Sequence, residues 1–156
     1  MLKKLLAPGK ADLGTDLGLL LLRLWLGGSM VALHGWDKLS NFNQKASTFP
    51  DPLGIGSTAS LAGCCAAEVL CAFFLVLGLG SRLVLPGLIF TMAVAWGKIH
   101  NFALSDNLLL NQRSGELAYI YLAGFCALLL TGPGRFSLDA LICGKGGGAS
   151  PKSKEK

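Results

Sequence analysis

Charged residues are scarce in this sequence. Lys, Arg, Asp and Glu make up 15% of its 156 residues, whereas a soluble domain carries about 25%. Hydrophobic residues make up 52%, and the mean hydropathy is +0.55. This balance excludes an ordinary soluble domain and indicates a protein of the lipid bilayer, where a helix needs about 20 apolar residues to cross the hydrocarbon.

Motifs for metal, phosphate and thiol chemistry are also missing. There are two histidines, and the five cysteines include no C-x-x-C pair. The glycine run 144–148 lacks the lysine and hydroxyl that follow the glycines of a phosphate loop. We therefore expect no metal site. Four cysteines fall within apolar runs and are interpreted mainly as small hydrophobic side chains with no assigned role: Cys64, Cys65, Cys71 and Cys126.

Four apolar runs dominate what is present, and each predicts a membrane-spanning helix. The third run is short, but Arg82 and Lys98 flank it and can extend their stems toward the headgroups. The predicted spans are residues 15–36, 57–79, 83–102 and 115–132. The predicted fold class is therefore an all-α, polytopic membrane protein with a four-transmembrane-helix bundle.

The remaining segments complete the expected organisation. Residues 1–13 form an N-terminal segment, residues 14–143 the membrane domain, and residues 144–156 a basic tail whose Gly, Ser and Lys content predicts disorder. Residues 37–56 form a long outer loop, whose aromatic residues indicate that it lies on or re-enters the outer face. Residues 136–142 follow a Gly-Pro-Gly break and predict a short interfacial helix.

The distribution of basic residues predicts the orientation. Nine Lys and Arg residues lie on the side of the two termini, and four lie on the other side. Because Lys and Arg accumulate in cytoplasmic loops, both termini are predicted to be cytoplasmic. The net charge of +5 follows from this asymmetry beside an anionic leaflet, so no nucleic-acid partner is expected.

Two charges lie deep inside the predicted spans. Arg23 is the only charge between Leu17 and Leu33, and Glu68 is the only charge between Pro52 and Ser81. At 1.5 Å per residue, they would lie about 12 Å and about 16 Å from the same end of the bundle. Because an unpaired Arg at a helix centre costs about 2.5–3.5 kcal/mol, we predict an Arg23–Glu68 ion pair facing a polar cleft. A functional pair and a purely structural pair both stay open.

A second polar group falls near the outer ends of the spans. This candidate outer cluster contains His34, Asp37, Lys38, His100 and Glu116. His34 and His100 lie at matching depths, where facing histidines can ligate haem or pass protons to a quinone. Interfacial anchoring of helix ends explains the same residues, and we expect no haem because neither histidine lies in a stronger motif.

Four pieces of the sequence, in this order, resemble the DoxX family of small bacterial membrane proteins. The resemblance implies a four-helix bundle in the bacterial inner membrane, and it places Arg23, His34, Gly35, Lys38, Glu68 and Glu116 at positions of the family pattern. Family members have been linked to quinone-coupled sulfur oxidation and to membrane assemblies that handle oxidative stress. The matching pieces are RLWLGGSMVALHGWDKL (23–39), AEVLCAFFLVLGLGSR (67–82), GELAYIYLAGF (115–125) and GPGRFSLDALI (132–142).

The leading hypothesis is an accessory subunit of a membrane redox system. It would hold a quinone or a small sulfur species near the polar seam and work with a membrane or peripheral protein partner. A non-catalytic scaffold or assembly subunit of a larger membrane complex is the main alternative, and a small-solute transporter is a third.

Overall fold

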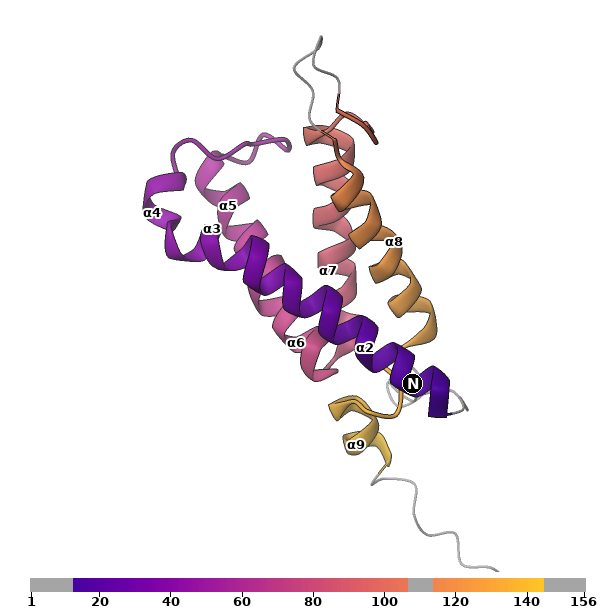
Figure 1. Cartoon of the computed structure of the whole chain (residues 1–156). Helices are drawn as coiled ribbons and strands as arrows, with labels where there is room; N and C mark the ends of the chain where they lie inside the picture. Colours follow the sequence, from indigo (N-terminus) through magenta and orange to yellow (C-terminus); the bar gives the residue numbers. More distant parts are fainter. Residues whose placement is uncertain (1–12, 107–113, 145–156) are drawn as a thin grey trace, which may run out of the picture.

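The computed structural model describes residues 13–106 and 114–144, and within these residues the chain is helical, with no strand (Figure 1). This confirms the all-α class. The predicted N-terminal segment, the middle of the second outer loop and the basic tail from residue 145 lie outside the described residues.

Three long apolar helices and one shorter one form the body of the protein. Leu13–Ser40, Ser57–Leu77 and Ser81–Ile99 are each long and apolar enough to cross a membrane, and Glu116–Thr131 is shorter. The fourth span therefore remains a prediction. In chain order the elements are α2 (Leu13–Ser29), η1 (Met30–Gly35), α3 (Trp36–Ser40), α4 (Phe42–Lys45), α5 (Ser57–Cys65), η2 (Ala66–Cys71), α6 (Ala72–Leu77), α7 (Ser81–Val94), η3 (Ala95–Ile99), α8 (Glu116–Thr131) and α9 (Leu138–Gly144).

The first helix runs further than its predicted end at residue 36. The π-helical turn η1 leads directly into α3, and the helix ends at Ser40. No glycine or proline interrupts residues 36–40, and the N–H of Asn41 still donates to the carbonyl of Asp37 at 3.1 Å. The expected outer loop at 37–56 is thus wrong at its start, because Asp37 and Lys38 belong to the helix.

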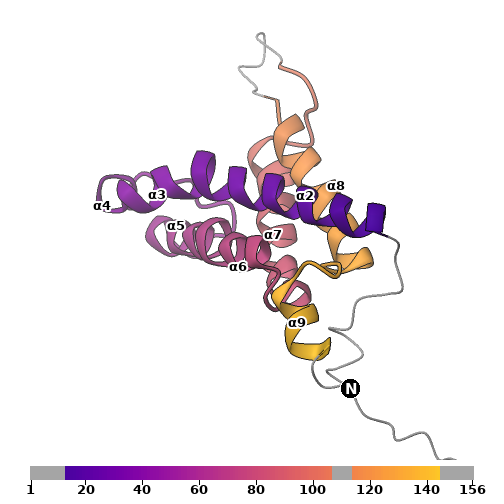
Figure 2. The same cartoon turned by 60° about the horizontal axis from the view of Figure 1, so that its bottom comes forward.

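The helices pack as two crossing pairs. Figure 2 shows α2 running alongside α6, while α7 and α8 form a second pair that crosses them. Where the pairs meet, the core contains buried Leu, Met and Phe side chains, among them Met30, Leu75, Leu88 and Phe125. The outer surface is also apolar: Trp25 is 79% exposed and Leu130 is 82% exposed. A surface of this kind suits contact with lipid.

Two glycines allow close approaches that position the site. A Cβ atom at Gly35 would lie 2.9 Å from the backbone oxygen of Glu68, so η1 and η2 can lie in contact. Gly78 ends α6 in the left-handed conformation with φ of +66°, and a Cβ there would overlap the guanidinium of Arg23. Glycine is the residue that fits both the conformation and the space at this position.

Candidate functional site

Arg23 is completely buried and donates hydrogen bonds to backbone carbonyls. Its Nη1 donates to Leu75 O and Val76 O, each at 3.3 Å, and its Nη2 donates to Phe136 O at 2.6 Å. Its electrostatic partner among the described residues is Asp139. The predicted Arg23–Glu68 pair is therefore replaced by a bond network that joins α2 to the end of α6 and to the segment before α9.

The segment that follows α8 is held against the end of the bundle by further bonds. The Asp139 carboxylate accepts from the N–H of Gly80 at 2.7 Å and of Ser81 at 3.0 Å, which caps the start of α7. Asp139 N–H donates to Gly78 O at 2.9 Å. A short helix, α9, thus lies where the sequence predicted one. Both the backbone N–H and the carboxylate of Asp139 hold it in place.

Glu68 pairs with Lys38 instead. The Nζ of Lys38 lies 2.5 Å from Glu68 Oε2, and it also lies 3.4 Å from the carbonyl of His34. The Glu68 side chain is 6% exposed and that of Lys38 is 21% exposed. Lys38 reaches Glu68 because the first helix continues past Trp36 and because η1 lies against η2. Pairing satisfies a carboxylate that would be costly to bury alone.

His34 lies beside this ion pair. It is close enough to Lys38 and Glu68 to interact with both electrostatically, and its ring meets that of Tyr121 edge-on, with centroids 5.6 Å apart. The Tyr121 hydroxyl in turn lies 2.8 Å from the hydroxyl of Ser29. Two members of the predicted outer cluster, His34 and Lys38, are thus brought together with Glu68.

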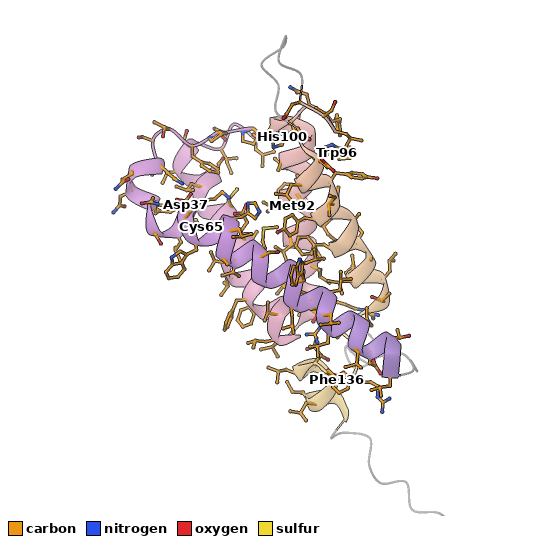
Figure 3. All side chains as sticks on the ribbon, in the orientation of Figure 1. Asp37, Cys65, Met92, Trp96, His100 and Phe136 are labelled. Carbon is orange, nitrogen blue, oxygen red and sulfur yellow. The ribbon has the colours of Figure 1, made fainter. Side chains whose placement is uncertain are left out.

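The other three members of the predicted outer cluster lie elsewhere. Asp37 is on the exposed side of α3, where it accepts hydrogen bonds from Asn41 and Lys45. His100 follows η3, near the start of α8, and Glu116 is exposed there. Figure 3 shows Asp37 and His100 at well-separated places. The single cluster of five predicted from the sequence is therefore divided among three places: beside Glu68, on the exposed side of α3, and near the start of α8.

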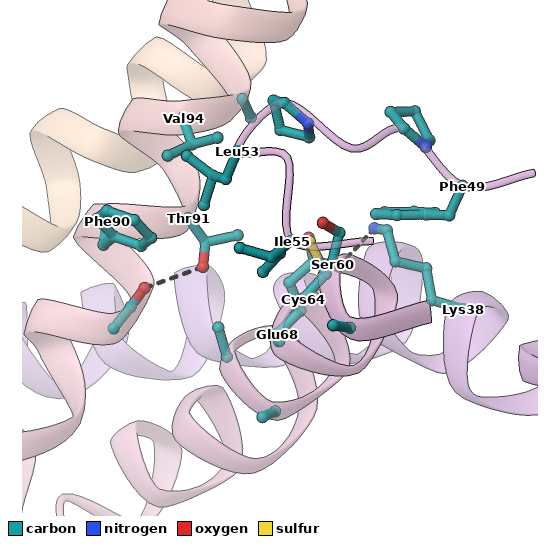
Figure 4. A pocket seen from close by; sticks show the side chains of 18 of the residues that line it. Lys38, Phe49, Leu53, Ile55, Ser60, Cys64, Glu68, Phe90, Thr91 and Val94 are labelled. Atoms are coloured by element: carbon teal, nitrogen blue, oxygen red, sulfur yellow. Dashed lines mark hydrogen bonds and ion pairs between the residues drawn. The ribbon is translucent and has the colours of Figure 1, made fainter. Parts of the chain in front are cut away.

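An apolar pocket of about 460 Å³ opens beside the ion pair (Figure 4). It lies between the second and third long helices and beneath residues 49–55, which we name the roof segment. Lys38 and Glu68 are the charged residues of its wall, and Ser60, Cys64 and Thr91 are the labelled polar ones. The remaining lining residues are Phe49, Pro50, Pro52, Leu53, Ile55, Ala59, Gly63, Ala66, Ala67, Cys71, Gly87, Phe90, Val94, Ala95 and Ile99.

Asp51 anchors the roof segment. Its Oδ1 accepts from the Ser60 hydroxyl at 2.8 Å and from Ile55 N–H at 3.0 Å, and its Oδ2 accepts from Gly56 N–H at 2.7 Å. The Ser60 hydroxyl and then the Gly56 N–H hold the pKa of the Asp51 carboxyl below its ordinary value. The long loop expected from its aromatic residues is thus a fixed cover over the pocket.

The four cysteines whose side chains the structure describes are free thiols. Cys64 and Cys71 line the pocket, Cys65 is buried and Cys126 is half-buried. Across residues 13–106 and 114–144, no three His, Cys, Asp or Glu side chains are grouped as metal ligands. Two of these four thiols, Cys64 and Cys71, therefore belong to the pocket wall.

The Lys38–Glu68 pair was not predicted from the sequence, and the cleft predicted beside Glu68 is lined mainly by apolar side chains. The absence of a helix breaker between residues 36 and 40 could have shown that Lys38 belongs to the first helix. The Lys38 ammonium has three N–H donors, of which two are directed at Glu68 and at the carbonyl of His34. The third is available to an acceptor in the pocket, so the site suits an apolar molecule with a hydrogen-bond-accepting head.

The fold and the pocket define a multi-pass helical membrane protein. A family model described as DoxX matches residues 18–101, and the chain belongs to the DoxX family. The matched range contains Arg23, the Lys38–Glu68 pair and the complete pocket wall. A Haemophilus influenzae protein described as uncharacterized is 27% identical over 136 residues, which cover 83% of this chain and 86% of that protein. No solved structure matches the chain significantly.

Proposed function

We propose that this protein binds a quinone in the apolar pocket and acts as an accessory subunit of a membrane redox system. The observation that carries the proposal is the largely buried Lys38–Glu68 pair in the wall of a mainly apolar cavity. A quinone combines a flat apolar ring and an apolar tail with carbonyl oxygens that accept hydrogen bonds. The apolar walls of the pocket complement the ring and the tail, and the third N–H donor of Lys38 complements a carbonyl oxygen.

The size of the pocket supports a ligand of this class. Its volume of about 460 Å³ lies within the range of about 300–1,000 Å³ that small-molecule sites occupy. Phe90 of α7 and Leu53 of the roof segment both line the cavity (Figure 4) and would contact the ring. Lys38 at one end would then hold a carbonyl oxygen, while Glu68 keeps the ammonium oriented.

An accessory role follows from the chemistry that a quinone requires. Reduction of a quinone takes up two electrons and two protons, and the electrons must come from a redox-active partner. We therefore place this protein beside a membrane or peripheral protein partner, in the inner membrane of a bacterial cell. In this arrangement the chain holds the ring and offers a hydrogen bond to its carbonyl oxygen.

Quantification of bound quinone tests the proposal. The protein is purified from native membranes in mild detergent, and the extracted quinones are measured by liquid chromatography and mass spectrometry. We expect near-stoichiometric quinone in the wild type and a decrease of about tenfold for Lys38→Met, since one good hydrogen bond from a charged donor is worth about 1.5 kcal/mol. Lys98→Met is the matched control, because Lys98 is exposed and outside the pocket wall.

Two results would contradict the quinone site. One is a wild-type protein without quinone after gentle purification. The other is an equal loss of quinone in the Lys98→Met control. A Lys38→Met, Glu68→Gln double variant removes both charges and shows whether any loss comes from misfolding of the single variant.

A scaffold function is the second candidate, and the bonds of Arg23 favour it. Arg23 joins three separate segments through backbone carbonyls, which serves rigidity rather than ligand binding. In this case the protein would copurify in a stable complex that contains no quinone. The complex would also persist in Lys38→Met and dissociate in Arg23→Met.

A further inference from the structure

A second hollow lies at the opposite end of the second helix from the roof segment. It is an open groove of about 470 Å³ between the end of α6 and α9. Leu77, Phe136, Leu138 and Leu141 form its apolar wall, and Arg135 lies on its rim. The Arg135 side chain is 62% exposed, and its Nε lies 3.6 Å from Asp16 Oδ2. The groove therefore combines apolar walls with a cation that still faces outward.

The groove is held open by the bonds already described. Arg23 fixes Phe136 through its carbonyl oxygen, and Asp139 fixes the start of α9 against Gly78 and the first turn of α7. These hydrogen bonds fix the segment in its position beside the end of α6. Four apolar side chains on and beside α9 stay partly exposed as a result: Phe136, Leu138, Leu141 and Ile142.

The charge of the sequence around this end is strongly positive. The start of α2 and α9 lie at the same end of the molecule (Figure 1). Beyond the described residues, the chain continues from them into residues 1–12 and 145–156, which contain seven lysines and two acidic residues. The partner that complements both features has an apolar chain and a negative charge.

We propose that this groove binds an anionic phospholipid of the surrounding leaflet. Its acyl chain would lie along Leu77, Leu138 and Leu141, and its phosphate would accept hydrogen bonds from the guanidinium of Arg135. Arginine donates to phosphate in a bidentate geometry, and basic pockets beside transmembrane helices hold anionic headgroups. This site is separate from the roofed pocket and does not depend on its ligand.

Lipid retention tests the proposal directly. The protein is incorporated into nanodiscs of phosphatidylcholine with about 10% phosphatidylglycerol, released into detergent, and the retained lipids are identified by native mass spectrometry. We expect phosphatidylglycerol to be enriched at least fivefold over its share of the bilayer. Arg135→Gln and Leu141→Ser should each abolish the enrichment, whereas Lys98→Gln, an equal loss of one exposed charge at the other end, should leave it unchanged.

Arg135→Gln tests the headgroup contact, and Leu141→Ser tests the acyl-chain contact. Arg135→Gln also removes the contact with Asp16, but Leu141 is 54% exposed, so Leu141→Ser should fold normally. Unchanged enrichment in Leu141→Ser would overturn the groove as the site. Equal retention of the two lipids by the wild type would overturn the preference for an anionic lipid.

Discussion

Arg23 and Glu68 are both charged residues buried in apolar helices, yet the two regions that hold them are built differently. Around Arg23, three carbonyl oxygens from distant segments converge on one guanidinium, and Gly78 is required to leave it room. Around Glu68, one lysine neutralises the carboxylate and an open pocket adjoins the pair. A buried charged residue thus joins helices without an adjoining pocket at Arg23, whereas at Glu68 it forms part of an accessible site.

The difference lies in what remains unused after folding. The Nη groups of Arg23 donate to backbone oxygens, and its Nε is buried without a hydrogen-bond partner among the described residues. Arg23 lines neither of the two pockets described above, so it has no space for a ligand beside it. Lys38 retains one donor toward a cavity large enough for a ligand. A buried charge is therefore a candidate functional group when its partners leave both a donor and space beside it.

Arg23→Met should cause the largest loss of stability. The substitution leaves the carbonyls of Leu75, Val76 and Phe136 without their donor in an apolar region, and unsatisfied buried polar groups cost about 1–3 kcal/mol each. We expect a loss on the order of 4 kcal/mol. It is measured as a lower yield of monodisperse protein and a lower unfolding temperature in detergent.

Gly78→Ala is the companion variant for this region. It keeps the charge of Arg23 but crowds its guanidinium and forces a side chain into the left-handed region. We expect Gly78→Ala to lower the unfolding temperature, but by less than Arg23→Met does. Wild-type unfolding temperatures for both variants would show that the hydrogen bonds of Arg23 contribute little to the stability of the fold.

Removing one member of the Lys38–Glu68 pair should have the next largest effect. Either Lys38→Met or Glu68→Gln alters a buried pair, and stranding one partner costs about 3 kcal/mol or more. Since Gln keeps hydrogen-bonding capacity, we expect the greater loss for Lys38→Met, which leaves the carboxylate alone. Unfolding temperatures of the two single variants and the double variant give the coupling energy.

The double variant sharpens the comparison between the two regions. We expect Lys38→Met with Glu68→Gln to be more stable than Lys38→Met alone, because no charge is then left unpaired. Combining Arg23→Met with Glu68→Gln should give additive effects, since the two residues share no partner. A strong coupling of Arg23 with Glu68 would contradict the bond network described above.

The smallest expected effect concerns pH and the roof segment. The pKa of Asp51 is held below its ordinary value of about 3.9, so its hydrogen bonds stabilise the roof at pH above that value. This contribution is lost as the pH falls through the folded-state pKa. Hydrogen exchange of residues 46–56, corrected for intrinsic rates, should therefore increase below about pH 4.

Asp51→Asn provides the control for this measurement. The amide cannot ionise, so the variant should exchange faster at neutral pH and should lose the pH dependence. A wild-type roof that exchanges equally at pH 3 and pH 6 would show that the Asp51 carboxylate does not hold it.

The helices were predictable from the sequence because apolar runs of sufficient length have few alternatives. The runs around Arg23 and Glu68 predict the first two long helices, and the Gly-Leu-Gly turn at 78–80 separates the second from the third. The end of the first helix was missed. Trp36, Asp37 and Lys38 suggest the polar end of a membrane span. Their helix propensities, however, do not require the helix to end there.

The ion pairs were not predictable from helical spacing alone. A regular period of 3.6 residues places Arg23 and Asp37 on one side of the first helix and leaves Lys38 aside. The π-helical turns η1 and η2 break this period immediately before Lys38 and around Glu68, and one extra residue in a turn shifts the following side chains by about 100°. Arg23 and Glu68 have similar predicted depths in the bilayer, which favours a pair between them. The shortest hydrogen bond of Arg23 goes instead to the carbonyl of Phe136, beyond the last predicted span.

The bond from Arg23 to Phe136 spans 113 residues of the chain, and this has a consequence for biosynthesis. A membrane protein is made from its N-terminus, so the first helix enters the bilayer with its arginine while the acceptors at Leu75, Val76 and Phe136 do not yet exist. The charge must be tolerated during this interval by water, headgroups or the insertion machinery. The first helix can therefore reach its final set of hydrogen bonds only after residue 136 has been synthesised.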